Sequence, residues 1–230
     1  ALTELLYPEA KVQITGFQDT LFPLKYFDGI FSNIQFGNYK VPDKKYYKHK
    51  WSIHEYFFGK SIDLLKPGGY LCFITSKYLL DKSDGKVRKY IAQRCELIGA
   101  VRLPAKVFSN IANTDVTTDI LILRKRGHEV VSNENWLHLG LTKDGVPCNE
   151  YYIDHPNRML GTMVFDRSMY GNEKGTACVN RDKSFDVAKE LRTVLDDIVA
   201  NAQTTASPVA VVSEPLRHTE EKAVEQTLPA

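Results

Sequence analysis

The sequence has 230 residues, of which 43% are hydrophobic and 25% are charged, and its formal net charge is +2. This length suits one domain with appendages, and so small a net charge gives no whole-chain sign of a nucleic-acid-binding protein. No apolar run approaches the roughly 18 residues that a membrane-spanning helix needs, so no membrane span is expected.

The first half of the sequence predicts strands and helices of an α/β fold. Ala1–Tyr7 is predicted to end a helix, and Lys11–Thr15 and Phe27–Asn33 to form short parallel strands, because their apolar runs imply burial on both faces. Ile53–Leu65 has helical periodicity, and Pro67-Gly68-Gly69 is expected to stop that helix. The remaining elements of this half are strands over Tyr70–Thr75, Leu97–Leu103 and Thr117–Arg124 and a helix over Gly85–Cys95.

The second half divides into an extension and a tail. Trp136–Tyr170 is predicted to be irregular and to connect or dock to other parts of a larger protein, and Phe185–Ala200 has the spacing of an amphipathic helix. From Thr204 to Ala230 the composition is patternless and rich in Ala, Pro, Val, Thr and Glu, which is typical of a disordered linker. We therefore predict three segments, 1–128, 129–203 and 204–230.

The cysteines bound the expected compartment and chemistry. Cys72, Cys95, Cys148 and Cys178 lie far apart in the sequence and form no Cys-x-x-Cys pair, so neither a zinc site nor a disulfide framework is expected. Together with the lack of a visible signal peptide, this pattern favours a reducing, cytoplasmic setting and no metal.

The segment from Tyr26 to Tyr39 is the most informative for function. Its apolar run ends in Ser32-Asn33-Ile34-Gln35-Phe36-Gly37, at the carboxyl end of a predicted strand, where α/β sheets bind ligands. The amide oxygen of Asn33 and the backbone carbonyl of Ile34 can each accept one N–H of a base amine, and Phe36 can stack on a base that has left the helix. Such stacking supplies about 1–3 kcal/mol. The alternative is a strand that ends in an asparagine turn.

An ordered series of motifs resembles a known family. Asn33-Ile34-Gln35-Phe36-Gly37 is similar to the Asn-Pro-Pro-Phe/Tyr loop of the amino-group DNA methyltransferases, which methylate N6 of adenine. The resemblance continues to about Gly161 and is closest to methylase domains that phages and mobile elements fuse to large helicases. Its further motifs are Ile53-His54-Glu55-Tyr56-Phe57-Phe58, Lys66-Pro67-Gly68-Gly69, Phe73-Ile74-Thr75-Ser76-Lys77, Val87-Arg88-Lys89-Tyr90, Gly99-Ala100-Val101-Arg102-Leu103-Pro104 and Thr118-Asp119-Ile120-Leu121.

The resemblance implies a fold, a cofactor and partners. The fold is a partial Rossmann-like sheet with an antiparallel edge hairpin, the cofactor is S-adenosylmethionine, and the partners are DNA, the missing upstream half of the methyltransferase and a helicase domain. Residues 1–128 would form the C-terminal part of the catalytic domain. The implied catalytic residues are Asn33, Ile34, Gln35 and Phe36, and the implied cofactor contacts are Phe17, Gln18 and Asn33.

The sequence departs from the family pattern in three places. Both loop prolines are replaced, by Ile34 and Gln35, which removes the rigidity that proline gives to a loop. Gln18 stands where the family more usually has an acidic residue, and Phe17 beside it can also be read as a core aromatic. The chain contains no Gly-x-Gly turn, the feature that lets a backbone approach a cofactor closely, so this turn is expected to precede Ala1.

A cluster of lysines and aromatic residues follows the candidate loop. Lysines at this place can neutralise DNA phosphates, and the interleaved Tyr46, Tyr47 and Trp51 can stack on bases or anchor a solvated loop to the core. The lysines proposed to contact DNA are Lys40, Lys44, Lys45, Lys48 and Lys50.

Three functions fit these observations. The first is a fragment of an S-adenosylmethionine-dependent DNA adenine-N6 methyltransferase. The second is a non-catalytic DNA-binding module, which the altered Ile34-Gln35 loop and the absent glycine turn favour for this polypeptide. The third is a scaffold segment that docks to a neighbouring helicase domain and binds neither ligand.

Overall fold

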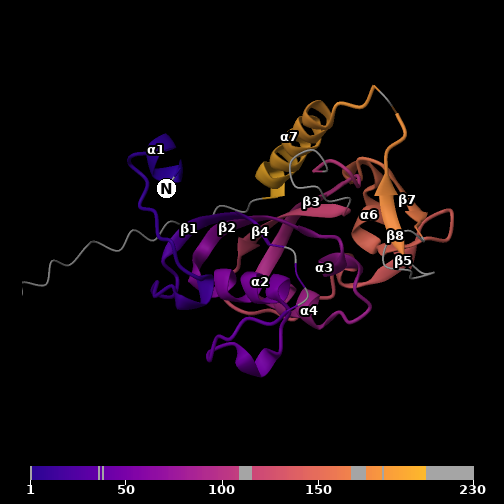
Figure 1. Cartoon of the computed structure of the whole chain (residues 1–230). Coiled ribbons are helices and arrows are strands. Elements are labelled where there is room, and N and C mark those ends of the chain that lie inside the picture. Colours follow the sequence, from indigo (N-terminus) through magenta and orange to yellow (C-terminus); the bar gives the residue numbers. More distant parts are fainter. Residues whose placement is uncertain are drawn as a thin grey trace, which may run out of the picture.

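The computed structural model describes residues 2–35, 37, 39–108, 116–166, 175–182 and 184–205 (Figure 1). The loop residue Phe36 and most of the segment predicted as a disordered linker, 206–230, lie outside the described residues. Within the described part of the chain, no helix has the length and apolar character needed to span a bilayer.

A four-stranded mixed sheet forms the centre of the molecule. Its strands are β1 (Phe27–Asn33), β2 (Leu65–Ser76), β3 (Cys95–Leu103) and β4 (Thr118–Lys125), in the spatial order β1-β2-β4-β3. β1 is parallel to β2, whereas β4 runs antiparallel to both β2 and β3. The predicted α/β class, with a Rossmann-like parallel pair and an antiparallel edge hairpin, is confirmed.

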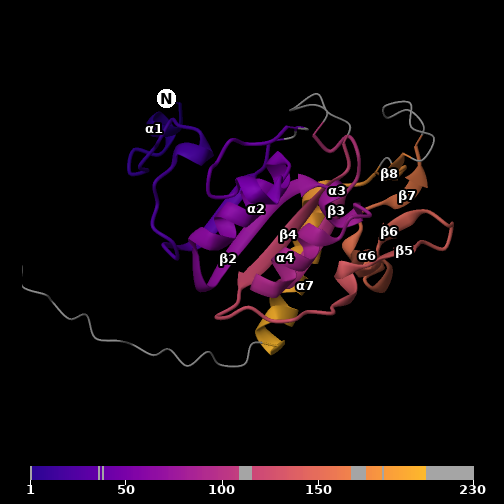
Figure 2. The ribbon, with the colours of Figure 1, turned by 90° about the horizontal axis from the view of Figure 1, so that it is seen from below.

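Helices α2 (Ile53–Leu64), α3 (Tyr78–Asp81) and α4 (Lys86–Arg94) cover one face of the sheet (Figure 2). Ser52 caps the start of α2, and its backbone N–H donates to the Glu55 carboxylate at 2.8 Å, the side-chain contact of a capping box. Phe58 of α2 is fully buried and meets Phe73 of β2 edge to face, with ring centroids 5.0 Å apart. This face therefore holds the main hydrophobic core, as the alternation of apolar residues along β2 requires.

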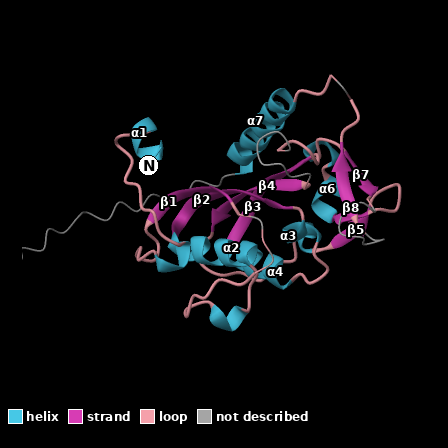
Figure 3. Cartoon of the chain, in the orientation of Figure 1, coloured by secondary structure: helices cyan, strands magenta, loops and turns pink. Residues whose placement is uncertain are grey.

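The opposite face is covered over one half of its width. Helix α7 (Val187–Thr205) buries Val194 and Ile198 against β3, close enough that a methyl group on Gly99 would lie 2.8 Å from Ile198. β1, at the other edge, leaves Phe31 75% exposed. Figure 3 shows α7 over the β3 side of the sheet.

The predicted irregular extension contains regular structure, so that prediction is wrong. The sequence signal was weak because each strand here has only three or four residues, shorter than the runs that reveal a period. The elements of this C-terminal lobe are η3 (Asn135–Leu137), β5 (Leu139–Leu141), β6 (Pro147–Asn149), α6 (Glu150–Asp154), η4 (Pro156–Arg158), β7 (Thr162–Phe165) and β8 (Thr176–Val179), with β5 pairing β6 and β7 pairing β8.

The strand predicted over Lys11–Thr15 does not form, and this prediction is also wrong. Residues 2–26 contain the short helix α1 (Leu2–Leu6) and the 3-10 turn η1 (Phe17–Asp19), and residues 11–15 have no assigned element. A strand needs a hydrogen-bonded neighbour, and β1 pairs with β2 on one side without a described strand on the other. In Figure 1, α1 stands away from the sheet beside the β1 edge.

The other boundaries differ by a few residues. α2 ends at Leu64 and β2 begins at Leu65, so Pro67-Gly68-Gly69 lies inside β2 as an irregularity, with Gly68 at φ +79°, rather than stopping the helix. α7 runs from Val187 to Thr205 instead of Phe185 to Ala200. The division at residue 128 stays a prediction, although the lobe that follows it packs closely on the sheet.

Candidate active-site cleft

The candidate loop begins where β1 ends. Asn33 is exposed and pairs with Ile74 across β1 and β2, and its side-chain amide makes no hydrogen bond with the described residues. Ile34 is 1% exposed, and its N–H donates to the Ile74 carbonyl at 3.0 Å. Gln35 is exposed again. The loop therefore holds one buried anchor between two polar side chains that are free to contact a ligand.

A cleft of about 780 Å³ opens beside this loop, between β1, α2 and the N-terminal segment. Asn33 itself is absent from the cleft lining, but its neighbours Ser32 and Gln35 contribute to it. The lining residues are Lys11, Gln13, Thr15, Gly16, Phe17, Gln18, Thr20, Phe22, Ile30, Phe31, Ser32, Gln35, Tyr39, Lys40, Val41, Pro42, Ile53, Phe57, Ser61 and Phe73. Two of the three predicted cofactor residues, Phe17 and Gln18, thus share a cavity with Ser32 and Gln35, whereas the third, Asn33, does not line it.

Phe17 is held in this cleft by contacts from α2. Its ring lies 4.9 Å from the Phe57 ring and 6.0 Å from that of Tyr56. The Lys60 ammonium donates to the carbonyls of Phe17 at 2.6 Å and Gln18 at 3.2 Å, and lies 5.0 Å from the Phe17 ring centroid. Phe17 is therefore both a packed aromatic and a wall of the cleft, which unites the two readings of this residue.

One buried polar atom faces the cleft without a partner. Ser61 is 1% exposed, lines the cleft, and its Oγ has no hydrogen-bond partner among the residues that the structure describes. A buried hydroxyl normally has a partner, since leaving one unpaired costs about 1–3 kcal/mol. An aromatic wall, a free hydroxyl and the polar Gln18 and Gln35 side chains together fit a flat, polar ligand such as an adenosyl group.

The lysine segment that follows the loop is anchored by its aromatic residues. Tyr46 donates to Asp63 at 2.8 Å, which together with burial raises the pKa of Tyr46 above its ordinary value. Trp51 is 8% exposed and stacks on His49 with centroids 4.1 Å apart. For these two aromatics the core-anchor reading holds, whereas Tyr47 is 76% exposed and available for stacking.

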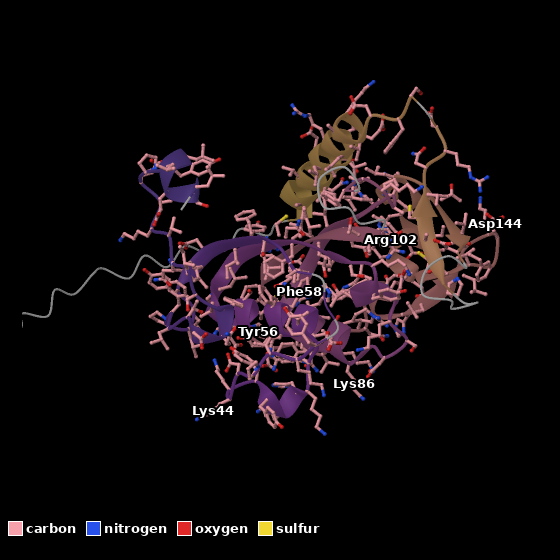
Figure 4. All side chains as sticks on the ribbon, in the orientation of Figure 1. Lys44, Tyr56, Phe58, Lys86, Arg102 and Asp144 are labelled. Carbon is pink, nitrogen blue, oxygen red and sulfur yellow. The ribbon has the colours of Figure 1, made fainter. Side chains whose placement is uncertain are left out.

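The lysines themselves project from this anchored segment. Four of the five proposed DNA contacts are exposed and make no ion pair with the described residues: Lys40, Lys44, Lys48 and Lys50. The fifth, Lys45, lies 3.1 Å from the Asp63 carboxylate with half of its side chain exposed. Figure 4 shows Lys44 on the projecting segment, on the α2 side of the sheet. The 3-10 turn η2 (Tyr47–His49) and Lys50, at φ +54°, fix the direction of this projection.

A buried ion network joins the sheet to the C-terminal lobe. Arg102 has no exposed side-chain surface, and its guanidinium donates to Asp119 at 2.8 and 2.9 Å and to Asp81 at 2.8 and 3.0 Å. Its Cζ lies 4.3 Å from the Tyr152 ring centroid. The two carboxylates hold the pKa of Arg102 above its ordinary value. Figure 4 shows Arg102 between β3 and the lobe.

Lys77, at the end of β2, serves the same junction. It is 2% exposed, its ammonium donates to Thr176 of β8 at 2.9 Å, and burial lowers its pKa. The hydroxyl of Tyr151 accepts the Ala100 N–H of β3 at 3.0 Å. The rim beyond β2 is thus closed by the lobe, and the open side of the sheet end lies toward β1.

Sequence reasoning located the loop, Phe17 and the lysines but missed three residues of α2. Phe57 and Ser61 line the cleft, and Lys60 holds the Phe17 wall through its carbonyl. Two adjacent polar residues, Lys60 and Ser61, within a largely buried helix were a usable signal in the sequence. Phe36, predicted to stack on a base, lies outside the described residues.

Comparison with known proteins finds a family to which part of this chain is similar. Residues 29–108 match the family model described as Eco57I restriction-modification methylase. This segment contains most of β1, the Asn33 loop, the lysine segment and the elements from α2 to β3. The resemblance predicted from the motifs is confirmed over it.

One curated relative and two solved structures carry related names. The defense against restriction protein B of Escherichia phage P1 is 30% identical over 143 residues, which are 60% of this chain and 6% of that protein. A protein of Listeria monocytogenes described as a class I S-adenosylmethionine-dependent methyltransferase is 26% identical, with a TM-score of 0.39, over 50% of this chain and 36% of its own. The M protein of the type I restriction enzyme EcoKI is 13% identical, with a TM-score of 0.39, over 80% and 51%.

This chain spans a small part of the phage relative and about a third of the Listeria protein.

Proposed function

We propose that this chain is part of an S-adenosylmethionine-dependent DNA methyltransferase that modifies the N6 amine of adenine. The observation that carries the proposal is the position of Asn33, an exposed amide at the carboxyl end of a parallel strand that makes no hydrogen bond with the described residues. It stands within the segment that matches the restriction-modification methylases and next to residues that line the cleft.

Asn33 and Ile34 would bind the amine of the target base. An exocyclic amine is a poor nucleophile because its lone pair is delocalised into the ring. The Asn33 amide oxygen and the Ile34 carbonyl would each accept one N–H, which holds the nitrogen in place and draws electron density toward it. The base reaches them after extrusion from the duplex, which costs a few kcal/mol, and stacking on Phe36 would return about 1–3 kcal/mol.

The cleft would hold the adenosyl group of the cofactor. Phe17 and Phe57 supply apolar walls, Gln18 supplies polar atoms, and the unpartnered Ser61 hydroxyl supplies a donor and an acceptor. When bound, S-adenosylmethionine brings an already activated methyl group, so the protein needs positioning more than strong base catalysis. This chain's residues would orient the two reactants and exclude water between them.

The lysine segment would contact the DNA backbone. Lys40, Lys44, Lys48 and Lys50 are exposed on an anchored segment beside the cleft, and Lys45 is half exposed. Each phosphate neutralised releases counterions, so binding should weaken steeply with added salt.

Another segment of the parent protein would cover the β1 side of the sheet. Among the described strands, β1 lies at the edge of the sheet. Half of all the large apolar side chains that are exposed in the described part of the chain belong to residues 2–31. Open edges and apolar patches of this kind usually mark a contact. We propose that another segment of the parent protein, carrying further parallel strands and the glycine turn, pairs here, and that a helicase domain belongs to the same parent.

A second candidate is a non-catalytic DNA-binding module. The observation in its favour is that Ile34 and Gln35 stand where the methyltransferase loop has two prolines. Such a module would bind DNA in a salt-sensitive manner and would not bind the cofactor.

Calorimetric titration with S-adenosylmethionine separates the two functions. We expect the chain alone to bind it weakly and a longer form, carrying the preceding residues of the parent protein, to bind it tightly. The enzyme proposal is overturned if neither form binds the cofactor while both bind DNA.

A further inference from the structure

Lys60 joins the cofactor side of the cleft to the lysine segment. Its ammonium donates to the carbonyls of Phe17 and Gln18 and lies 3.4 Å from Asp43 Oδ2. The side chains of Lys60 and Asp43 are 8% and 12% exposed. The buried Lys60 ammonium therefore contacts both the Phe17-Gln18 turn and Asp43, which are more than 20 residues apart in the sequence. The turn and the residues just before Asp43 line the same cleft.

Asp43 fixes the start of the lysine segment. Its other contacts are the Tyr56 hydroxyl, which donates at 2.8 Å, and the Lys45 N–H, which donates to Oδ1 at 3.0 Å. These donors favour the ionised carboxylate. The carbonyl of Asp43 also accepts the Tyr46 N–H at 3.1 Å. A shift of Asp43 would therefore move the backbone that carries Lys44 and Lys45.

The other end of the contact fixes the turn η1. The Asp19 N–H donates to the Gly16 carbonyl, and the Thr20 N–H and hydroxyl both donate to the Phe17 carbonyl. The Lys60 ammonium donates to the same Phe17 carbonyl. Within the described residues η1 has no neighbouring strand, so this ammonium and the aromatic contacts of Phe17 are its principal attachments to α2.

We propose that Lys60 is a positioning residue that couples the cofactor-side turn η1 to the DNA-side lysine segment, so that a ligand that orders one segment favours binding at the other. The inference deepens the proposed function and rests on it for the identity of the two ligands, an adenosyl group and DNA. The coupling itself depends on contacts that are present in the chain without either ligand. Loss of Lys60 would release both segments at once, which a residue that merely packs in one place would not do.

Hydrogen exchange with mass spectrometry tests the coupling without a ligand. Asp43→Asn removes the charge at the DNA side. We expect it to speed exchange of the Asp19 and Thr20 amides about five-fold or more in the wild-type background and to leave them unchanged in a Lys60→Met background. Lys60→Met alone should speed exchange at both Thr20 and Tyr46. Lys66→Met, which removes an exposed pair with Asp28, is the matched control and should change neither.

Each result decides the question. If Asp43→Asn has the same effect on Asp19 and Thr20 with and without Lys60, or none in either background, the coupling is wrong. Should Lys60→Met fail to fold, Lys60→Gln keeps a donor to the two carbonyls while removing the charge toward Asp43 and replaces it in the cycle. Fluorescence anisotropy with a labelled DNA duplex is run in parallel, and absence of DNA binding with intact coupling counts against the proposed function alone.

Discussion

The Ile34 N–H and the Ile74 carbonyl form a hydrogen bond of 3.0 Å that carries the β1–β2 pairing one residue past Asn33. This bond replaces the rigidity that a proline would give the loop. Ile34, the residue after Asn33, is fixed by a hydrogen bond to the sheet instead of by a proline ring. Asn33 therefore lies at a strand end whose following residue is held in place.

The loop bond predicts different outcomes for the two proline substitutions. Ile34→Pro removes a buried donor and a buried side chain, and we expect it to lower the free energy of unfolding by about 2–5 kcal/mol. Gln35→Pro, at an exposed residue without a positive φ, should change it by less than about 1 kcal/mol. Urea denaturation measures both. Equal losses for the two variants would mean that the Ile34 bond does not fix the loop.

Asn33 predicts a loss of activity without a loss of stability. In the parent protein, Asn33→Ala should reduce methyl transfer to DNA to the background level, because one of the two acceptors for the base amine is gone. The melting temperature should stay within about 1–2 °C, since the side chain is exposed and unpartnered. Transfer of tritiated methyl groups measures the activity. Asn133→Ala, another exposed asparagine, is the control, and retained transfer by Asn33→Ala would remove Asn33 from the site.

The Arg102 network predicts a large stability loss. Arg102→Met leaves Asp119 and Asp81 without their cation in a buried position, and removal of one partner of a buried pair typically costs about 3–5 kcal/mol. Arg124→Met, which removes a partly exposed pair with Glu96, should cost about 0–1 kcal/mol. Chemical denaturation gives both values. A small effect at Arg102 would show that the C-terminal lobe does not depend on this network.

The close contact between Gly59 and Trp51 predicts that alanine at this helix position lowers the thermal stability. A methyl group there would lie 2.1 Å from Cζ3 of the buried Trp51, and overpacking of this kind costs about 1–3 kcal/mol. That loss outweighs the gain of about 1 kcal/mol that alanine brings to a helix. Thermal unfolding of Gly59→Ala should therefore show a lower midpoint, whereas Gly127→Ala, with open space around it, should not. A higher midpoint for Gly59→Ala would mean that Trp51 can move freely.

His54 predicts a pH dependence of stability. Burial lowers its pKa in the fold, while in the unfolded chain the value is about 6.5. The unfolded chain then binds the proton more tightly, so this contribution is complete above about pH 6.5 and is lost as the pH falls toward the lowered value. His54→Asn should flatten the stability profile below about pH 6.5, and His128→Asn, at an exposed position, should leave it unchanged. A profile unaltered by His54→Asn would assign the pH dependence to other groups.

The sheet could be predicted from sequence where its strands are long and apolar. β1, β2, β3 and β4 each have seven or more residues, and their burial patterns leave a readable signal. The C-terminal lobe could not, because its strands are short and it is joined to the sheet by contacts such as Lys77 with Thr176, between residues distant in the sequence. The strand expected at Lys11–Thr15 was wrong because an apolar run does not fix whether a partner strand is present.

Some residues of the candidate site could be predicted from the sequence and others could not. Asn33 and Phe17 follow from local motifs, whereas Lys60 became visible only when its ammonium was seen to reach the carbonyls of a segment 42 residues earlier. A buried lysine in a helix gives no indication from sequence of whether it serves a carboxylate, a carbonyl or both.

The edge of β1 has a practical consequence for handling the chain in solution. β1 has one row of N–H and C=O groups that pairs with no other described strand, beside the 75% exposed ring of Phe31, and such an edge is a template for pairing with another copy. We expect the purified chain to self-associate with rising concentration, to bind dyes that report exposed apolar surface, and to become monodisperse when a complementary strand is supplied in the same polypeptide. Charged substitution at Phe31 is the simplest way to keep it monomeric for the experiments above.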